Sequence, residues 1–198
     1  FINLPSRTDR RAHVEAAFPP SRGFQLQRFE ANPDMPSGIV GCLDSHIRAL
    51  ERVYEMAQAP GAPAAPVAPV ALVLEDDAQW NPRVSCSKAT HVVRTALESL
   101  AANPRAWDVC MLGFTMPSAN PEPCGPDLPG FVQCNGELSL TAYLVRVAYI
   151  PALLAEVRPM LPAAYEDPHS YAFAVDVLFQ RLHREHKGRW IRPHKAII

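Results

Sequence analysis

The densest group of chemically active side chains in this sequence is an acidic triplet, Glu75, Asp76 and Asp77, which directly follows the apolar run at residues 71–74. A short apolar run bounded by loop signals is typical of a buried strand. Three adjacent carboxylates at the end of such a strand repel one another, and a bound cation relieves that repulsion. Carboxylate ligands favour Mg²⁺ or Mn²⁺. The triplet alone is equally compatible with a solvated acidic turn.

The composition limits the classes of protein to consider. A chain of 198 residues is long enough for one domain with a proper core, and a 48% hydrophobic and 20% charged composition is typical of a globular protein. The net charge of −1 argues against a general attraction to nucleic acid. We also expect no transmembrane segment, because no apolar run reaches the length of a membrane span.

The start of the chain and its cysteines bear on the compartment. The sequence opens on Phe1 without an initiator Met or a signal-type segment, which predicts a catalytic core within a longer protein. Its five cysteines include no C-x-x-C pair, which argues against a zinc ribbon or a thioredoxin-type site. Cys124 and Cys134 flank a Pro/Gly-rich stretch and are candidates for a loop disulfide in an oxidising compartment. The odd number of cysteines leaves that compartment open.

The apolar patterns predict strands alternating with helices. We expect strands at residues 1–4, 24–29, 71–74, 107–113, 138–145 and 190–193, and helices at residues 10–18, 39–58, 87–103, 148–156 and 167–185. This alternation favours an α/β sandwich, in which helices flank a central, mostly parallel sheet, formed by a single domain over residues 1–198. The Ala/Pro-rich residues 59–69 are predicted as a surface loop, and the Pro-rich residues 116–130 as a lid or an acceptor-side insertion.

Four motifs, in order along the chain, resemble glycosyltransferase family 25, which includes lipopolysaccharide glycosyltransferases and procollagen galactosyltransferases. The first is Ile-Asn-Leu-Pro-Ser-Arg-Thr-Asp-Arg-Arg at residues 2–11, and the second is Gly-Ile-Val-Gly-Cys-Leu-Asp-Ser-His at residues 38–46. The third is Leu-Val-Leu-Glu-Asp-Asp at residues 72–77. The fourth is Thr-Ala-Tyr-Leu at residues 141–144, followed by Leu153, Leu154 and Asp176. Each motif alone is weak, but the ordered set spans nearly the whole chain.

The resemblance implies a GT-A-type fold that binds a nucleotide sugar, with Mn²⁺ or Mg²⁺ as cofactor. It implies inverting transfer of a hexose, galactose or glucose, from a UDP-sugar donor to a hydroxyl of a glycan or protein acceptor. A eukaryotic member would be expected in the lumen of the secretory pathway, and a bacterial member in the cytoplasm. The Ala/Pro-rich tract, the proline-rich loop and the short C-terminus depart from the family, so the acceptor is the least transferable part of the resemblance.

The implied metal site centres on the acidic triplet. Asp77 is the predicted direct ligand, with Glu75 spaced as the other outer acid of a D-x-D-type element. Glu75 or Asp76 is predicted to reach the donor ribose or a metal-bound water, although Asp76 alternatively only orients its neighbour. His194 is a candidate for a late metal ligand, with an exposed surface role as the alternative.

Five further residues are predicted to bind the donor. Arg7 and Arg10 follow the first strand, and a guanidinium suits bidentate contact with the diphosphate; the alternative is a solvated first turn of a helix. Asn3 either contacts the nucleotide or satisfies backbone groups at the end of the strand. Ser45 and His46 lie early in a helix after a Gly-rich turn, where N–H groups favour anions; His46 is alternatively a buried structural histidine.

An inverting transfer needs one general base on the acceptor hydroxyl. Asp176, an acid within an apolar helix start, is the predicted base, and Asp167 and Glu166 are alternatives. A second functional hypothesis is a catalytically inert relative that serves as a binding or adhesion module. A third hypothesis, a metal-dependent nucleotidyltransferase, ranks last because residues 3–11 contain no Gly for a phosphate-binding loop.

Overall fold

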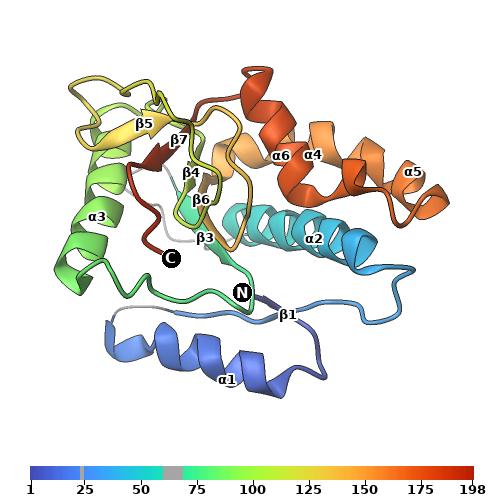
Figure 1. The fold of residues 1–198 in the computed structure, drawn as a ribbon. Helices are drawn as coiled ribbons and strands as arrows, with labels where there is room; N and C mark the ends of the chain where they lie inside the picture. The colour runs from blue at the N-terminus through green and yellow to red at the C-terminus, as the bar shows by residue number, and fades with distance from the viewer. Residues whose placement is uncertain (23–24, 60–68) are drawn as a thin grey trace.

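The computed structural model describes residues 1–22, 25–59 and 69–198, which form a mixed α/β fold with two sheets (Figure 1). The two-stranded sheet pairs β1 (Ile2–Asn3) with β2 (Phe29–Glu30). The larger sheet has the order β3-β6-β4-β7-β5, with β3 (Val70–Leu74), β4 (Val109–Met111), β5 (Phe131–Gln133), β6 (Ala142–Arg146) and β7 (Trp190–Pro193). A parallel bridge from Ile2 to Glu75 connects the two sheets.

The larger sheet is mostly antiparallel, so the predicted mostly parallel sheet is wrong. Strand β6 lies between β3 and β4 and runs antiparallel to both, and β5 runs antiparallel to β7. The reason is that no helix lies in the described segment between β4 and β6, and a return to the parallel direction usually runs through a helix. Strands β3, β4 and β7 nevertheless point the same way, because β3 and β4 share β6 as an antiparallel neighbour and β7 is parallel to β4.

Helices cover both faces of the larger sheet. In Figure 1, α2 (Gly38–Gln58), α4 (Ile150–Val157) and α6 (Val175–Arg184) lie on one side and α3 (Cys86–Ala102) on the other, with α1 (Thr8–Ala17) packed beneath. The alternation of side chains along β6 divides the core between these layers. Tyr143 and Val145 pack with α2, α4 and α6, whereas Ala142 and Leu144 pack with α1 and α3.

Other elements differ from the sequence-based expectations near proline-rich segments. The predicted helix at residues 167–185 begins only at Val175, because a turn and a short 3₁₀ helix (Tyr171–Phe173) precede it. The short helix α5 (Leu161–Glu166) and strand β5 were not predicted. Of the strand predicted at residues 24–29, residue 24 lies outside the described residues, residues 25–28 form no strand, and β2 comprises Phe29–Glu30. Most of the predicted loop at residues 59–69 lies outside the described residues.

A buried ion pair holds the loops around β5 against β7. Arg192 Nε donates to Glu137 Oε1 at 2.6 Å, and both side chains are at most 1% exposed. Glu137 also accepts the backbone N–H groups of Ser118 and Asn135, so one carboxylate ties the Pro-rich loop to the turn before β6. The Arg192 guanidinium lies over the Phe114 ring, 4.9 Å from its centroid. This arrangement fixes segments that the sequence alone leaves without regular structure.

We expect Glu137→Gln to lower the free energy of unfolding by about 3 kcal/mol, because it leaves the buried Arg192 without its counter-charge. Urea unfolding followed by tryptophan fluorescence measures the change. The control is Glu122→Gln, which alters an exposed glutamate of the same loop and should change stability by less than about 0.5 kcal/mol. Equal midpoints for the two variants would contradict this role for the buried pair.

Candidate functional site

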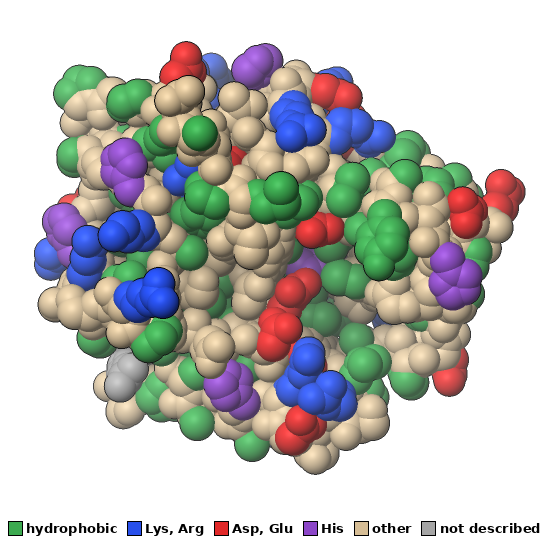
Figure 2. Space-filling view, in the orientation of Figure 1, with side chains coloured by type: hydrophobic (Ala, Val, Ile, Leu, Met, Phe, Trp, Pro, Cys, Tyr) green, Lys and Arg blue, Asp and Glu red, His purple; other side chains and the backbone are tan. Residues whose placement is uncertain are grey.

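A cavity of about 440 Å³ opens where β1 and β3 end and α2 begins. The parallel bridge from Ile2 to Glu75 places the carboxyl ends of β1 and β3 side by side. Figure 2 shows acidic side chains in a hollow near the centre of the face in view, with basic side chains beside them. The charged side chains that line the cavity are Arg7, Arg10, Glu75, Asp76 and Asp77. The volume lies within the range of small-molecule sites.

The fold brings most of the predicted site residues to this one cavity. Eight of them line it: Asn3, Arg7, Arg10, Ser45, His46, Glu75, Asp76 and Asp77. Three separate motifs of the sequence therefore meet at one place, from β1 and α1, from the start of α2 and from the end of β3. Two predicted residues, Asp176 and His194, are not among the residues that line the cavity.

Both carboxylate oxygens of Asp76 accept hydrogen bonds from other side chains of the protein. Its Oδ2 accepts Asn3 Nδ2–H at 2.9 Å, and its Oδ1 accepts Arg10 Nη1–H at 2.7 Å. Asn3 is in turn saturated, since it also donates to the carbonyl of Arg7 and accepts from Arg28. Asp76 thus fastens β1 and α1 to the end of β3. These contacts match the alternatives in which Asn3 satisfies backbone groups and Asp76 orients its neighbours.

Asp77 is the open acid of the triplet. Its side chain is 54% exposed, and the nearest cation is Arg10, whose Nη1 lies 3.7 Å from Asp77 Oδ2. Partial burial and the neighbouring Glu75 carboxylate raise the pKa of Asp77, while Arg10 opposes the rise. A half-exposed carboxylate at a cavity wall, with one cation at the edge of ion-pair distance, fits the binding of a divalent cation.

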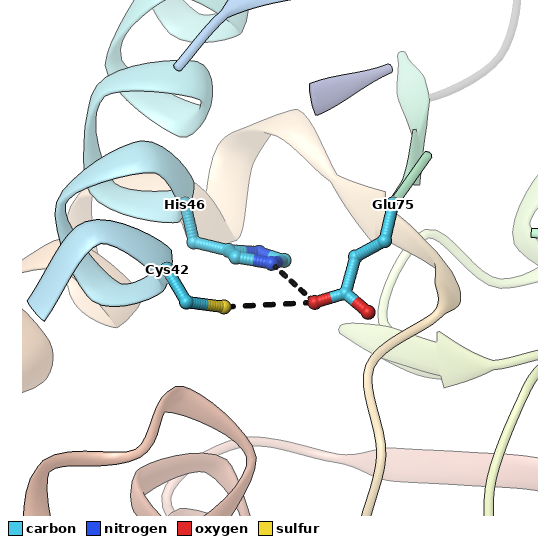
Figure 3. A group of neighbouring side chains, drawn as sticks. All are labelled: Cys42, His46 and Glu75. Atoms are coloured by element: carbon cyan, nitrogen blue, oxygen red, sulfur yellow. Dashed lines mark hydrogen bonds and ion pairs between the residues drawn. The ribbon is translucent and has the colours of Figure 1, made fainter. Parts of the chain in front are cut away.

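Glu75 points toward Cys42 and His46 of α2 (Figure 3). Its Oε1 lies 3.3 Å from His46 Nε2 and 3.6 Å from Cys42 Sγ. His46 is 1% exposed, and its Nδ1 lies 3.0 Å from the hydroxyl of the buried Tyr143. Burial acts to raise the pKa of Glu75, but the contacts with His46 and Cys42 outweigh it and hold the pKa below its ordinary value.

Cys42 is a site residue that the sequence-based reasoning missed. It appeared only as part of the resemblance motif, without a role of its own. Burial and the nearby Glu75 carboxylate raise the pKa of the Cys42 thiol. The available signal was spacing, because Cys42 and His46 stand four residues apart on one helix and therefore share a face.

The first turn of α2 forms one wall of the cavity. Ser37 caps the helix by accepting the N–H of Val40, and Ser37, Gly38 and Gly41 line the space. A Cβ on Gly38 would meet no atom within 4 Å, so this glycine leaves room at the wall. Ser45 is buried and donates to the carbonyl of Gly41 at 2.6 Å, which is a contact within the helix.

Arg7 lies at the mouth of the cavity and is already paired. Its guanidinium donates two hydrogen bonds to Asp9, at 2.9 and 2.8 Å, and its side chain is 42% exposed. The Asp9 carboxylate raises the pKa of Arg7, so this side chain stays a cation. Arg10 reaches deeper and contacts both Asp76 and Asp77.

Asp176 does not line the cavity and lies in the first turn of α6. Its Oδ1 accepts the N–H of Val177 at 2.9 Å, and its Oδ2 accepts the N–H of Ser139 at 3.4 Å. Ser139 has a φ of 77° and hydrogen-bonds the hydroxyl of Thr141, whose carbonyl accepts the N–H of Glu75. A short chain of contacts therefore connects Asp176 to the end of β3.

The remaining predicted residues lie elsewhere. His194 is exposed just after β7, and Asp167 and Glu166 are exposed around the end of α5. Cys124 and Cys134 are both free thiols.

A scan against models of known protein families found no match, and a search of curated proteins also found none. Among the described residues, no helix has the length and apolar character needed to cross a membrane. The geometry of the cavity is therefore the main guide to what the protein does.

The structure predicts opposite effects for the two neighbouring aspartates. Asp76→Asn should lower stability by about 1–3 kcal/mol, because it weakens two hydrogen bonds to a buried carboxylate. Asp77→Asn should raise stability at pH 7. The pKa of Asp77 is higher in the folded state, so the folded protein loses stability as the pH rises through the titration range of this carboxyl. That gain should vanish below the titration range, where Asp77 is protonated anyway. Urea unfolding at neutral and acidic pH measures both effects, and a loss of stability in both variants at pH 7 would contradict the assignment.

Proposed function

We propose that the protein is a metal-dependent inverting glycosyltransferase that transfers a hexose from a UDP-sugar to a hydroxyl of a glycan or protein acceptor. The observation that carries the proposal is the convergence of three separate motifs on one cavity at the carboxyl ends of β1 and β3. Ligands of open α/β sheets bind beyond the carboxyl ends of the strands, which is where this cavity opens. A GT-A-type fold is part of the proposal, and the shared direction of β3, β4 and β7 supports it.

The donor diphosphate would lie between the arginines and the start of α2. Arg10 and Arg7 supply positive charge at the cavity wall, and a guanidinium contacts phosphate oxygens in bidentate fashion. The first turn of α2 adds backbone N–H groups and the positive end of a helix dipole. Gly38 leaves the space that such an approach requires. These groups would orient the donor before any bond breaks.

Asp77 and the outer oxygen of Glu75 would hold Mn²⁺ or Mg²⁺. Asp77 is exposed to the cavity, and no hydrogen bond from the described residues reaches Glu75 Oε2. The metal ion supplies charge neutralisation for the departing diphosphate. Arg10, which contacts both aspartates, holds the acids in place and adds a second positive charge. His194 stays a prediction as a third ligand.

Asp176 would accept the proton of the acceptor hydroxyl. Inversion is a single displacement, so one base on the acceptor side suffices. The contacts through Ser139 and Thr141 connect Asp176 to the end of β3. Ser139 helps to orient this carboxylate, because its N–H is donated to Oδ2.

We expect Asp77→Ala to abolish Mn²⁺-dependent binding of UDP while the fold stays intact. The measurement is thermal unfolding with a panel of nucleotide diphosphates and UDP-sugars, each with and without Mn²⁺. A ligand at a hundred times its dissociation constant stabilises the wild type by about 2.7 kcal/mol, which is readily detected. The matched control is Asp127→Ala, an exposed aspartate of the Pro-rich loop, which should bind UDP normally. Unchanged affinity in Asp77→Ala would remove the metal assignment.

We expect Asp176→Asn to keep donor binding but to lose transfer, because the amide cannot accept the proton. Release of UDP from a UDP-hexose in the presence of a glycan acceptor measures turnover, and thermal shift measures binding. Asp167→Asn and Glu166→Gln serve as controls and should transfer normally, since both side chains are exposed. Normal transfer by Asp176→Asn would place the base elsewhere. Donor binding by the wild type without any turnover would favour the binding-module hypothesis.

A further inference from the structure

Cys42, His46 and Glu75 bring three different metal-ligating atoms together at the inner wall of the cavity. Cys42 and His46 come from successive turns of α2, Glu75 follows β3, and all three side chains point toward one another (Figure 3). Their sulfur, nitrogen and oxygen atoms lie within 4.8 Å of one another. All three residues line the cavity, so a metal held there would be accessible from it.

Two of the three separations match those between ligands of one tetrahedral metal ion, and the third, from sulfur to nitrogen, is at most 4.8 Å. With Zn–N and Zn–O bonds of about 2.05 Å and a Zn–S bond of about 2.3 Å, tetrahedral angles place N and O about 3.3 Å apart and S and O about 3.6 Å apart. The observed distances are 3.3 Å from His46 Nε2 to Glu75 Oε1 and 3.6 Å from Cys42 Sγ to the same oxygen. A charge-assisted hydrogen bond between imidazole and carboxylate is usually shorter, about 2.7–2.9 Å.

Tyr143 supports the same arrangement from behind the histidine. Its hydroxyl lies 3.0 Å from His46 Nδ1, and the two rings are stacked with centroids 5.8 Å apart. A ligating histidine characteristically donates its other N–H to an oxygen acceptor, which fixes both the tautomer and the orientation of the ring. When Nδ1–H is donated to Tyr143, the lone pair of Nε2 points toward Glu75 and Cys42.

We propose that Cys42, His46 and Glu75 form a zinc site with an open fourth position. Thiolate, imidazole and carboxylate suit Zn²⁺, whereas Mn²⁺ and Mg²⁺ prefer oxygen ligands alone. The two anionic ligands balance the charge of the ion, and the thiol proton passes to solvent when the metal binds. Three protein ligands with one open position are the pattern of catalytic rather than structural zinc sites.

The fourth ligand would be an oxygen from the cavity, either water or a hydroxyl or phosphate oxygen of a bound molecule. The zinc site uses Oε1 of Glu75, whereas the metal assigned to Asp77 uses Oε2, so the two proposed sites share this one side chain. The proposal does not rest on glycosyl transfer, because the geometry of these three side chains carries it alone. Asp77→Ala and Cys42→Ser therefore distinguish the two sites, because each removes a ligand of one site only.

The test is titration of the metal-free, reduced protein with Co²⁺, without nucleotide. Cobalt bound to a thiolate gives a near-ultraviolet charge-transfer band, and we expect one equivalent of Co²⁺ to produce it and one equivalent of Zn²⁺ to abolish it. Cys42→Ser should lose the band, whereas Cys86→Ser, which changes an exposed cysteine outside the cavity, should keep it. Glu75→Gln should weaken Zn²⁺ binding at least about tenfold, and Tyr143→Phe about 10–100-fold.

Asp77→Ala separates this site from the proposed donor metal, because it should keep the cobalt band while losing Mn²⁺-dependent UDP binding. Absence of the band in the wild type overturns the proposal, as does a band that survives in Cys42→Ser. If Cys42→Ser fails to fold, the rate at which a thiol reagent labels Cys42 in the wild type decides the question. Zinc should slow that labelling at least about tenfold, and an unchanged rate overturns the proposal.

Discussion

The site depends on the hydrogen-bonded carboxylate of Asp76. Asn3 and Arg10 both donate to this group, so the two-residue strand β1 and the helix α1 are fastened to the end of β3. A two-stranded pairing as short as β1 with β2 gives little stability by itself. Because Asp76 is engaged in this way, its two neighbours are free to point in different directions. Asp77 points toward the exposed side of the cavity, and Glu75 points toward α2.

The three carboxylates of the acidic triplet therefore differ in their surroundings rather than in their side-chain chemistry. Asp76 accepts hydrogen bonds from protein donors, Asp77 is half-exposed at the cavity, and Glu75 contacts a histidine and a thiol. Side chains of the same charge acquire different properties when their neighbours differ. One short stretch of sequence thus contributes ligands to both proposed cation sites, one suited to oxygen-preferring ions and the other to zinc.

The reversal of β6 has a direct consequence for the site. Because β6 lies between β3 and β4, it places Tyr143 under α2, against His46, and it places Thr141 beside Glu75. A sheet in which β3 and β4 were direct parallel neighbours would put neither residue there. The segment that leads into this antiparallel strand is therefore the one that connects Asp176, through Ser139 and Thr141, to Glu75.

The sequence by itself determined the elements that carry the chemistry. The helix at α2, the strand at β3 and the residues at their ends follow from local periodicity and from the contrast between apolar and acidic stretches. Only the tertiary structure decided the strand directions, the saturation of Asn3 and Asp76, and the role of Cys42 beside Glu75. The physical reason is that periodicity reports which face of an element is buried, whereas strand order and side-chain partners depend on contacts between residues far apart in the chain.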